Sequence, residues 1–152
     1  MSIAQRDKIF ISYSHNDHKA FEQLKTMLAP VMRSGKIDVW DDTMIDPGRK
    51  WKDEIESALE KAKIAVLLVS DNFLASDFIA RHELPPLLKA AQDKGLTVSW
   101  IYLSSCLYKE TEIAEYQAAH DVAKPLGQLT RPIRQQTLRK ICEKLVQAVQ
   151  AP

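Results

Sequence analysis

The chain has 152 residues, of which 45% are hydrophobic and 27% charged, with a formal net charge of +1. This composition predicts one globular domain over residues 1–152, itself able to belong to a longer protein, and gives no reason to expect a nucleic acid or membrane partner. No apolar run approaches the ~20 residues that span a bilayer, and the N-terminus lacks a secretory apolar core. Cys106 and Cys142 have no framework spacing, so we expect a reducing, cytoplasmic location.

The first third of the chain alternates β-rich runs with amphipathic stretches. Residues 8–13 predict a strand, and the helix that follows it ends at Gly35. Residues 37–40 predict a second strand, and Pro47-Gly48 marks a turn in the loop after it. Residues 51–62 then predict a second helix, because their apolar side chains recur at helical spacing.

The middle and end of the chain continue this alternation. Residues 64–69, IAVLLV, form the unbroken apolar run typical of a strand buried on both faces of a parallel sheet. A helix ending at Gly95 precedes a fourth strand over residues 96–103, and a last amphipathic helix covers residues 132–149. Six of the seven charges after residue 121 are basic, which favours a solvated helix face over a surface for an acidic partner.

Strands and helices in this order predict an α/β fold with a parallel sheet of four to five strands and helices on both faces. A short helix is expected over residues 112–120, and a fifth strand, if present, near residues 123–126. Ligands of such sheets bind at the carboxyl ends of the strands. We therefore expect the floor of a site at Ser12-Tyr13-Ser14, after the first strand, and at Ser70-Asp71, after the third.

Several kinds of site are disfavoured. With four glycines, the chain contains neither of the glycine-rich phosphate-binding motifs. Ser70 stands where a phosphoacceptor aspartate would end the third strand, and His15 and His18 lack a third metal ligand. Ser14, His15 and Asp17 are too close in sequence to converge as a hydrolase triad. We therefore expect no metal site and no bound prosthetic group.

The stretch SDFIARHELPPLL, residues 76–88, places two prolines directly after an acid and an apolar residue. Pro85 and Pro86 cannot donate a backbone hydrogen bond, but proline is tolerated in the first turn of a helix. The pattern predicts one segment ending near Glu83 and a second helix beginning at Pro85 or Pro86. Glu83 would lie near the positive end of the second helix and be ionised. Periodicity alone favours a capping role for Glu83 over a functional one.

Three motifs in order carry a family resemblance. KIFISYSHND, then VWDD…DPGRKW, then AKIAVLLVSDNFLASDFIARHEL together resemble the TIR (Toll/interleukin-1 receptor) domain family, and are most similar to its bacterial members. The resemblance covers residues 8 to about 104, and each motif alone would be weak. It implies a flavodoxin-like arrangement of the sheet. For many bacterial and plant members it also implies cleavage of NAD at the nicotinamide–ribose bond, which makes NAD a substrate.

The resemblance also assigns site residues. Glu83 occupies the position of the family's catalytic glutamate. Trp51 matches an aromatic position that lines the ligand cleft, and Ser12, Tyr13 and Ser14 match the segment that forms the other wall. The resemblance implies a glycohydrolase that gives nicotinamide and ADP-ribose or a cyclic isomer, in bacterial defence signalling.

The sequence differs from many family members beside Glu83 and has one candidate catalytic carboxylate. Ile79 occupies the position four before the glutamate, where many members have an aromatic residue, and Phe78 lies beside it. A single carboxylate suffices for this reaction, because the cationic nicotinamide leaves as a neutral base and needs no general acid. Arg49 or Lys50 could meet the diphosphate, although both are more often plain surface charges.

The alternative function is a non-enzymatic TIR–TIR interaction module that self-associates through the loop from Asp41 to Lys50. This loop is charged and carries two apolar residues, Met44 and Ile45, which suit an interface. Assembly and catalysis are compatible, because enzymatic members of the family commonly assemble to complete the site. A nucleotide sensor of the same fold without catalysis is a third reading.

Overall fold

The structure is a computed structural model that describes residues 7–44 and 50–151. Its centre is a sheet of four parallel strands in the order β2-β1-β3-β4. The strands are β1 (Lys8–Ser12), β2 (Asp38–Asp41), β3 (Ala62–Val69) and β4 (Thr97–Tyr102). Because the chain passes from β2 across β1 to β3, the winding direction reverses between β1 and β3, where parallel sheets bind ligands.

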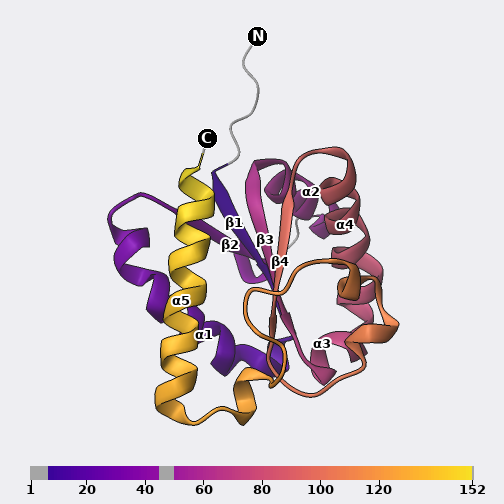
Figure 1. Ribbon diagram of the computed structural model, residues 1–152. Helices are drawn as coiled ribbons and strands as arrows, with labels where there is room; N and C mark the ends of the chain where they lie inside the picture. Colours follow the sequence, from indigo (N-terminus) through magenta and orange to yellow (C-terminus); the bar gives the residue numbers. More distant parts are fainter. Residues whose placement is uncertain (1–6, 45–49, 152) are drawn as a thin grey trace.

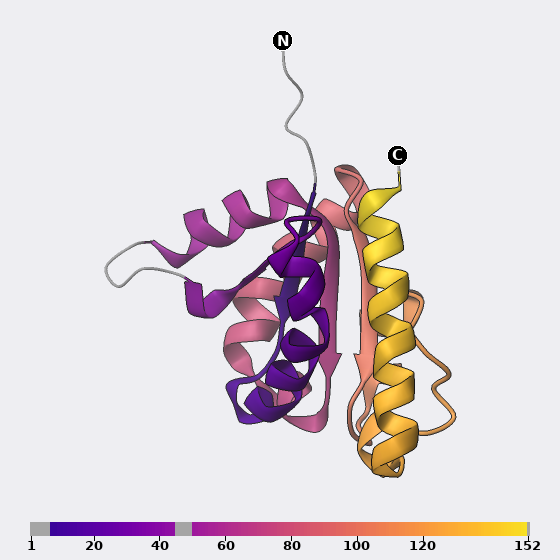
Figure 2. The same ribbon diagram turned by 90° about the vertical axis from the view of Figure 1, so that its left-hand side faces the viewer.

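Helices cover both faces of this sheet (Figures 1 and 2). They are α1 (His18–Arg33), α2 (Trp51–Lys61), α3 (Asp71–Ala75), α4 (Leu84–Asp93) and α5 (Arg131–Gln150). One apolar cluster joins α1 and α5 to one face of the sheet, and a second joins α2, α3 and α4 to the other. This three-layer arrangement confirms the α/β, flavodoxin-like fold expected from the sequence.

The local signals of the sequence explain most of these elements. Seven of the eight residues of β3 are buried, as the apolar run requires of a central strand. Gly35 and Gly95 follow the ends of α1 and α4 with φ angles of 81° and 79°, the left-handed conformation that ends many helices. Both glycines were predicted to end their helices, and both predictions are confirmed.

The segment between β4 and α5 departs from the predictions. The helix expected over residues 112–120 is a single 3-10 turn, Glu112–Glu115. No strand forms over residues 123–126; instead, an isolated bridge joins Ala118 to Trp100 at the free edge of β4. Among the described residues the sheet therefore has four strands, and a single bridge takes the place of a fifth.

Side chains complete the edge of β4 where a fifth strand would bind. The Ala119 N–H donates to the Trp100 carbonyl over 2.7 Å, and the Trp100 indole donates to the Tyr116 carbonyl over 2.8 Å. The Tyr102 N–H donates to His120 Nε2 over 3.0 Å. Because an unpaired edge strand invites association with other chains, these bonds close a vulnerable edge.

The chain around Glu83 is helical but irregular. Residues Ile79–Glu83 form a π-helix, and the Leu84 N–H donates to the Ile79 carbonyl five residues back. Helix α4 follows at once, with Pro85 and Pro86 in its first turn. The predicted junction is confirmed in position. The first segment does not end there, however, because the wider π-turn carries the chain into α4 without a break.

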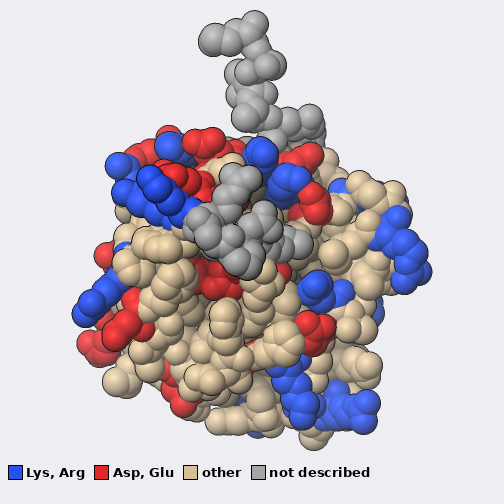
Figure 3. Space-filling model, turned by 180° about the vertical axis from the view of Figure 1, so that it is seen from behind, with Lys and Arg blue, Asp and Glu red and all other residues tan. Residues whose placement is uncertain are grey.

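The surface shows no concentration of one charge on the face that carries α2 and α4. Figure 3 shows basic and acidic side chains interspersed around an uncharged central area. Within the described residues, none of the helices is both long and apolar enough to cross a bilayer.

Candidate functional site

A pocket of about 520 Å³ lies at the carboxyl ends of β1 and β2. The residues after these strands form one wall, and residues of α3 and the π-helix form the other. Its lining is Tyr13, Ser14, His15, Asn16, Asp42, Asn72, Ala75, Ser76, Phe78, Ile79 and Glu83. The pocket therefore combines residues from the two regions that the sequence pattern and the family resemblance had pointed to separately.

Glu83 is fully buried at this pocket, with 0% of its surface exposed. The Ser12 hydroxyl, at the end of β1, donates to Glu83 Oε1 over 3.4 Å. Within the described residues, Glu83 Oε2 is buried without a hydrogen-bond partner. Since buried polar atoms are nearly always paired, an unpaired oxygen facing a pocket marks a position where a ligand can bind.

The surroundings of Glu83 oppose its charge. Burial, then the charge of Asp42 and its side-chain contact with Glu83, and the charge of Asp41 together raise its pKa from 4.5 to about 8. The Ser12 hydrogen bond acts in the opposite sense but does not balance them. The expectation that the helix N-terminus keeps Glu83 ionised is therefore wrong for the protein alone. Removal from water and two nearby acids outweigh the helix dipole.

Tyr13 provides a second unpaired polar atom at the pocket. Its ring stacks on Phe21 of α1 with centroids 4.1 Å apart, and its hydroxyl is buried without a partner in the described part of the chain. Burial, with the charges of Asp41 and Asp42, raises the pKa of Tyr13 well above its usual range. Tyr13 is therefore a neutral phenol that can donate a hydrogen bond.

Two consecutive acids lie at the end of β2, Asp41 as its last residue and Asp42 directly after it, and they make different contacts. Asp41 is 1% exposed and accepts hydrogen bonds from the Thr43 N–H, over 2.9 Å, and the Thr43 hydroxyl. This contact fixes the turn after β2. Asp42 lines the pocket, and its Oδ1 lies 3.2 Å from His15 Nε2. Asp42 is thus the acid that faces the pocket from the strand beside β1.

A small hydrogen-bond network closes one end of the pocket. The Ser70 hydroxyl donates to Asp17 Oδ2, and Asn72 Nδ2 lies 3.4 Å from Asp17 Oδ1. Ser70 also accepts from the Phe73 N–H over 2.9 Å, which caps α3. The prediction that Ser70-Asp71 would form the floor of the site is wrong, because capping and the bond to Asp17 use the Ser70 hydroxyl and Asp71 is exposed.

Three rings meet beside the pocket. The Trp51 centroid lies 4.2 Å from His82 and 5.7 Å from Phe78, and Phe78 lies 5.4 Å from His82. Phe78 lines the pocket and remains 37% exposed, whereas Trp51 lies outside the lining. Trp51 therefore supports Phe78 instead of forming the wall itself, and Ile79 forms a buried part of the lining.

The other predicted residues divide between the two walls and the undescribed part. Ser14 lines the pocket, while Ser12 lies behind it and reaches the site through Glu83. Ile45, Pro47-Gly48 and Arg49, and the side chain of Met44, lie outside what the structure describes, so the interface assigned to this loop remains a prediction. No group of three metal-binding side chains occurs in residues 7–44 and 50–151.

Sequence reasoning missed several pocket residues. Asp42 was read only as part of an interaction loop, and Asn72 and Ser76 were not considered. The available signal was position: Asp42 directly follows β2, which pairs with β1, so both strands deliver their polar ends to one edge of the sheet. Applying that rule to every strand would have identified Asp42.

Three known proteins or families resemble the chain. Residues 9–133 match the family model described as TIR domain. A protein of Sinorhizobium fredii called "Uncharacterized protein y4lF" is 29% identical over 120 residues, which cover 79% of this chain and 37% of that protein. The chain thus spans little more than a third of this relative's length. The TIR domains of the activated Roq1 resistosome recognising the effector XopQ share the fold, with a TM-score of 0.51, 17% identity, and coverage of 90% of this chain and 83% of theirs.

Proposed function

Because the chain belongs to the TIR domain family, we propose that it is a glycohydrolase that cleaves the nicotinamide–ribose bond of NAD. Its products are nicotinamide and ADP-ribose or a cyclic isomer, and its role is in bacterial defence signalling in the cytoplasm. The observation that carries the proposal is the buried carboxyl of Glu83, whose Oε2 lacks a partner among the described residues and lies at a pocket. NAD is the substrate, and no prosthetic group takes part.

The reaction needs little from the protein. The bond between ribose C1′ and the ring nitrogen breaks, and its electron pair leaves with nicotinamide, which becomes neutral. Water then attacks C1′ and loses a proton, which gives ADP-ribose. The positive charge that develops on the ribosyl centre is stabilised by a nearby carboxylate, which is the role we assign to Glu83. Ser12 positions that carboxylate through the hydrogen bond to Oε1.

Glu83 must lose its proton to act in this way. The carboxyl has a pKa of about 8, so it is mainly protonated at neutral pH before NAD binds. A cationic nicotinamide ring beside it favours the ionised form and lowers its pKa. The positively charged substrate thus prepares the carboxylate that it needs, whereas a neutral N-glycoside would not.

The ring cluster supplies an apolar surface for the nicotinamide. Phe78 is exposed at the pocket and is held by Trp51 and His82. We assign to Phe78 the stacking contact that the residue at position 79 makes in many relatives, because Ile79 is aliphatic and buried. We assign hydrogen bonds to the substrate to Ser14 and Tyr13, because both line the opposite wall of the pocket.

We also propose that activity depends on self-association through the loop from Asp41 to Lys50. The specific support is that Asp42, at the start of this loop, lines the pocket and raises the pKa of Glu83. A partner that moves this loop would therefore change the charge of the site. In the purely structural alternative, the same loop would join TIR domains without any turnover of NAD.

The test is nicotinamide release from NAD by concentrated protein, followed by liquid chromatography with and without a crowding agent. We expect release by the wild type and a loss of at least about a hundredfold in Glu83→Gln. Asp77→Asn is the matched control, because Asp77 is an exposed carboxylate on the same stretch. Thermal melts must show that both variants are folded. An inactive wild type would leave only the interaction function, and an active Glu83→Gln would refute the assignment of Glu83.

A further inference from the structure

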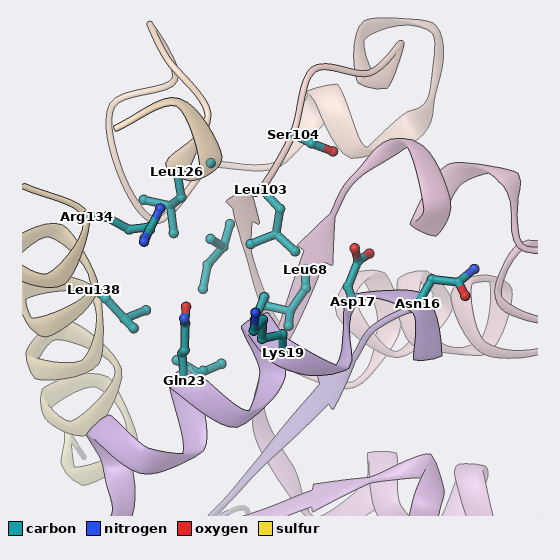
Figure 4. Close-up of a pocket in the computed structure, with 14 residues that line it drawn as sticks. Asn16, Asp17, Lys19, Gln23, Leu68, Leu103, Ser104, Leu126, Arg134 and Leu138 are labelled. Atoms are coloured by element: carbon teal, nitrogen blue, oxygen red, sulfur yellow. The ribbon is translucent and has the colours of Figure 1, made fainter. Parts of the chain in front are cut away.

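A second cavity of about 380 Å³ opens on the α1 and α5 side of the sheet, separated from the candidate site by a wall to which Asn16 belongs. It lies between these two helices and the ends of β3 and β4, and the 3-10 turn Leu126–Gln128 closes it on one side (Figure 4). Nothing in the proposed NAD chemistry uses it. We propose that this cavity binds a small organic anion with an aliphatic or aromatic body, at a site separate from that of Glu83.

The floor of the cavity is aliphatic and rigid. Five apolar side chains from four different elements and a turn meet there, each at most 8% exposed: Leu24, Leu68, Ile101, Leu126 and Leu138. Backbone contact fixes the turn that carries Leu126, because the Gly127 N–H donates to the Leu103 carbonyl over 3.0 Å. A β-carbon at Gly127 would also lie 3.0 Å from that oxygen, so a glycine suits this close approach.

The rim of the cavity carries positive charge. Lys19 of α1 and Arg134 of α5 both line it, and Figure 4 shows them coming from different helices. Within residues 7–44 and 50–151, neither forms an ion pair with a carboxylate. Arg134 lies in the first turns of α5, whose N-cap residue Thr130 provides no side-chain hydrogen bond, so the positive end of the helix dipole adds to the same field.

The one acid that lines the cavity is already engaged. Asp17 accepts from the Ser70 hydroxyl with Oδ2 and from the Asn72 amide with Oδ1. The Asp17 carboxylate is therefore neutralised in part by hydrogen bonds within the wall that separates the two cavities. Asn16 belongs to the same wall and lines both cavities. The Ser104 hydroxyl on the rim is also engaged, because it donates to Asp71 Oδ1 over 3.0 Å. The groups left to bind a ligand are Lys19, Arg134 and the Gln23 amide, whose positive charges and N–H donors complement an anion.

The shape and charge together define the ligand class. Aliphatic walls of this size suit a compact hydrocarbon or aryl body, and a carboxylate, sulfonate or phosphate can form charge-assisted hydrogen bonds with a half-buried guanidinium. Among the described residues, no aromatic side chain lines the cavity, so a stacked nucleobase is a poorer match than a simple organic acid. The proposal commits to such an acid and does not depend on the proposed glycohydrolase.

The test compares two fluorescent probes with the same ring system on the full chain. 1-Anilinonaphthalene-8-sulfonate carries the negative charge, and N-phenyl-1-naphthylamine is its neutral counterpart. We expect the sulfonate to bind one saturable site. The double variant K19Q/R134Q should weaken it by about tenfold or more, the scale of one charge-assisted hydrogen bond, and leave the neutral probe unchanged within about twofold.

Two control variants localise the effect. Arg139→Gln removes an exposed arginine of the same helix that pairs with Glu143 and does not line the cavity, and it should change neither affinity. Phe78→Ser removes the exposed ring of the candidate active site and should leave sulfonate binding intact. All four substitutions in these three variants are at exposed or half-buried positions, so folding is expected to persist and is verified by melting.

Equal sulfonate affinity in wild type and K19Q/R134Q, or binding lost only in Phe78→Ser, would overturn the proposal. The groove could instead bind a second copy of the chain. In that case, sedimentation would show a dimer of the wild type that K19Q/R134Q disrupts. The wild type and K19Q/R134Q would then bind the sulfonate equally, and this result would also refute the anion site. Failure of this test would not bear on nicotinamide release, because the anion site and the proposed glycohydrolase activity are tested separately.

Discussion

The Ser12 hydroxyl lies 3.4 Å from Glu83 Oε1, which joins the end of the first strand to a π-turn 71 residues later in the chain. The carboxyl's other oxygen is buried without a hydrogen-bond partner in the described residues, and the Asp42 carboxyl lies close enough to raise the pKa of Glu83. Among the described residues, the Ser12 bond is therefore the contact that stabilises the ionised form of Glu83 in a strongly desolvated environment. The behaviour of Glu83 should depend on the charge of the neighbouring acids.

The first prediction concerns the pH dependence of nicotinamide release. Because the free protein must deprotonate Glu83, whose pKa is about 8, kcat/KM should rise from pH 6 to pH 8.5 and then level off. Asp42→Asn removes a charge that raises this pKa, so the rise should move to lower pH by about one unit. The measurement is initial rate at low NAD against pH. An identical profile in both proteins would show that Asp42 does not act on Glu83.

The second prediction concerns stability. A folded-state pKa of about 8 against an ordinary 4.5 means that Glu83 disfavours the folded state as it ionises. The stability lost should amount to about 1.4 kcal/mol per pH unit between these two values. Glu83→Gln has no such group, so it should melt above the wild type at pH 8 and at about the same temperature as the wild type at pH 4. The melting temperature of Asp77→Asn should follow that of the wild type from pH 4 to pH 8. If the melting temperature of Glu83→Gln also changed with pH in parallel with the wild type, Glu83 would not be a buried neutral acid.

The third prediction separates binding from chemistry at the ring cluster. Phe78→Leu keeps an apolar side chain but removes the ring, so KM for NAD should rise by roughly 3–10-fold while kcat stays within about twofold. Phe78→Tyr retains the ring and should behave as the wild type. Steady-state kinetics of the two variants make the comparison. If both lose activity equally, stacking is not the contribution of this position.

The fourth prediction concerns the edge of β4. His120 accepts the Tyr102 N–H with Nε2, and its Nδ1 lies 2.9 Å from the Asp121 carbonyl, so it must be neutral with its proton on Nδ1. Burial lowers its pKa below the usual 6.5. Stability from this contact is therefore complete above pH 6.5 and is lost as pH falls through the lowered pKa.

His120→Gln tests this contact, because a glutamine oxygen can accept the same bond without titrating. From pH 7.5 to pH 5 the wild type should lose more of its melting temperature than the variant. Equal losses would place the acid sensitivity elsewhere in the chain.

The fold was largely predictable because its signals are local. The run IAVLLV marks a central strand by composition alone, and two adjacent prolines are compatible with few helical geometries other than the first turn of α4. Glu83 was reached through the resemblance, since periodicity favoured a capping role. What could not be predicted depends on distant contacts. The protonation of Glu83 reflects two acids, Asp41 and Asp42, about forty residues earlier in the chain, and the closing of the sheet edge uses a histidine side chain.

The direction in which the Glu83 carboxyl points depends on the number of residues in the π-turn Ile79–Glu83. A regular α-helix turns by about 100° per residue. Each residue inserted or deleted in the π-turn would therefore rotate the preceding segment relative to α4 about the helix axis. With the present count, Ile79 and Leu87 both face the core while Glu83 is directed at the pocket. Deleting one residue between them would restore ordinary helical geometry and rotate the acid away from Ser12. The position of the Glu83 carboxyl is therefore more vulnerable to a shift in length than to many changes of side chain.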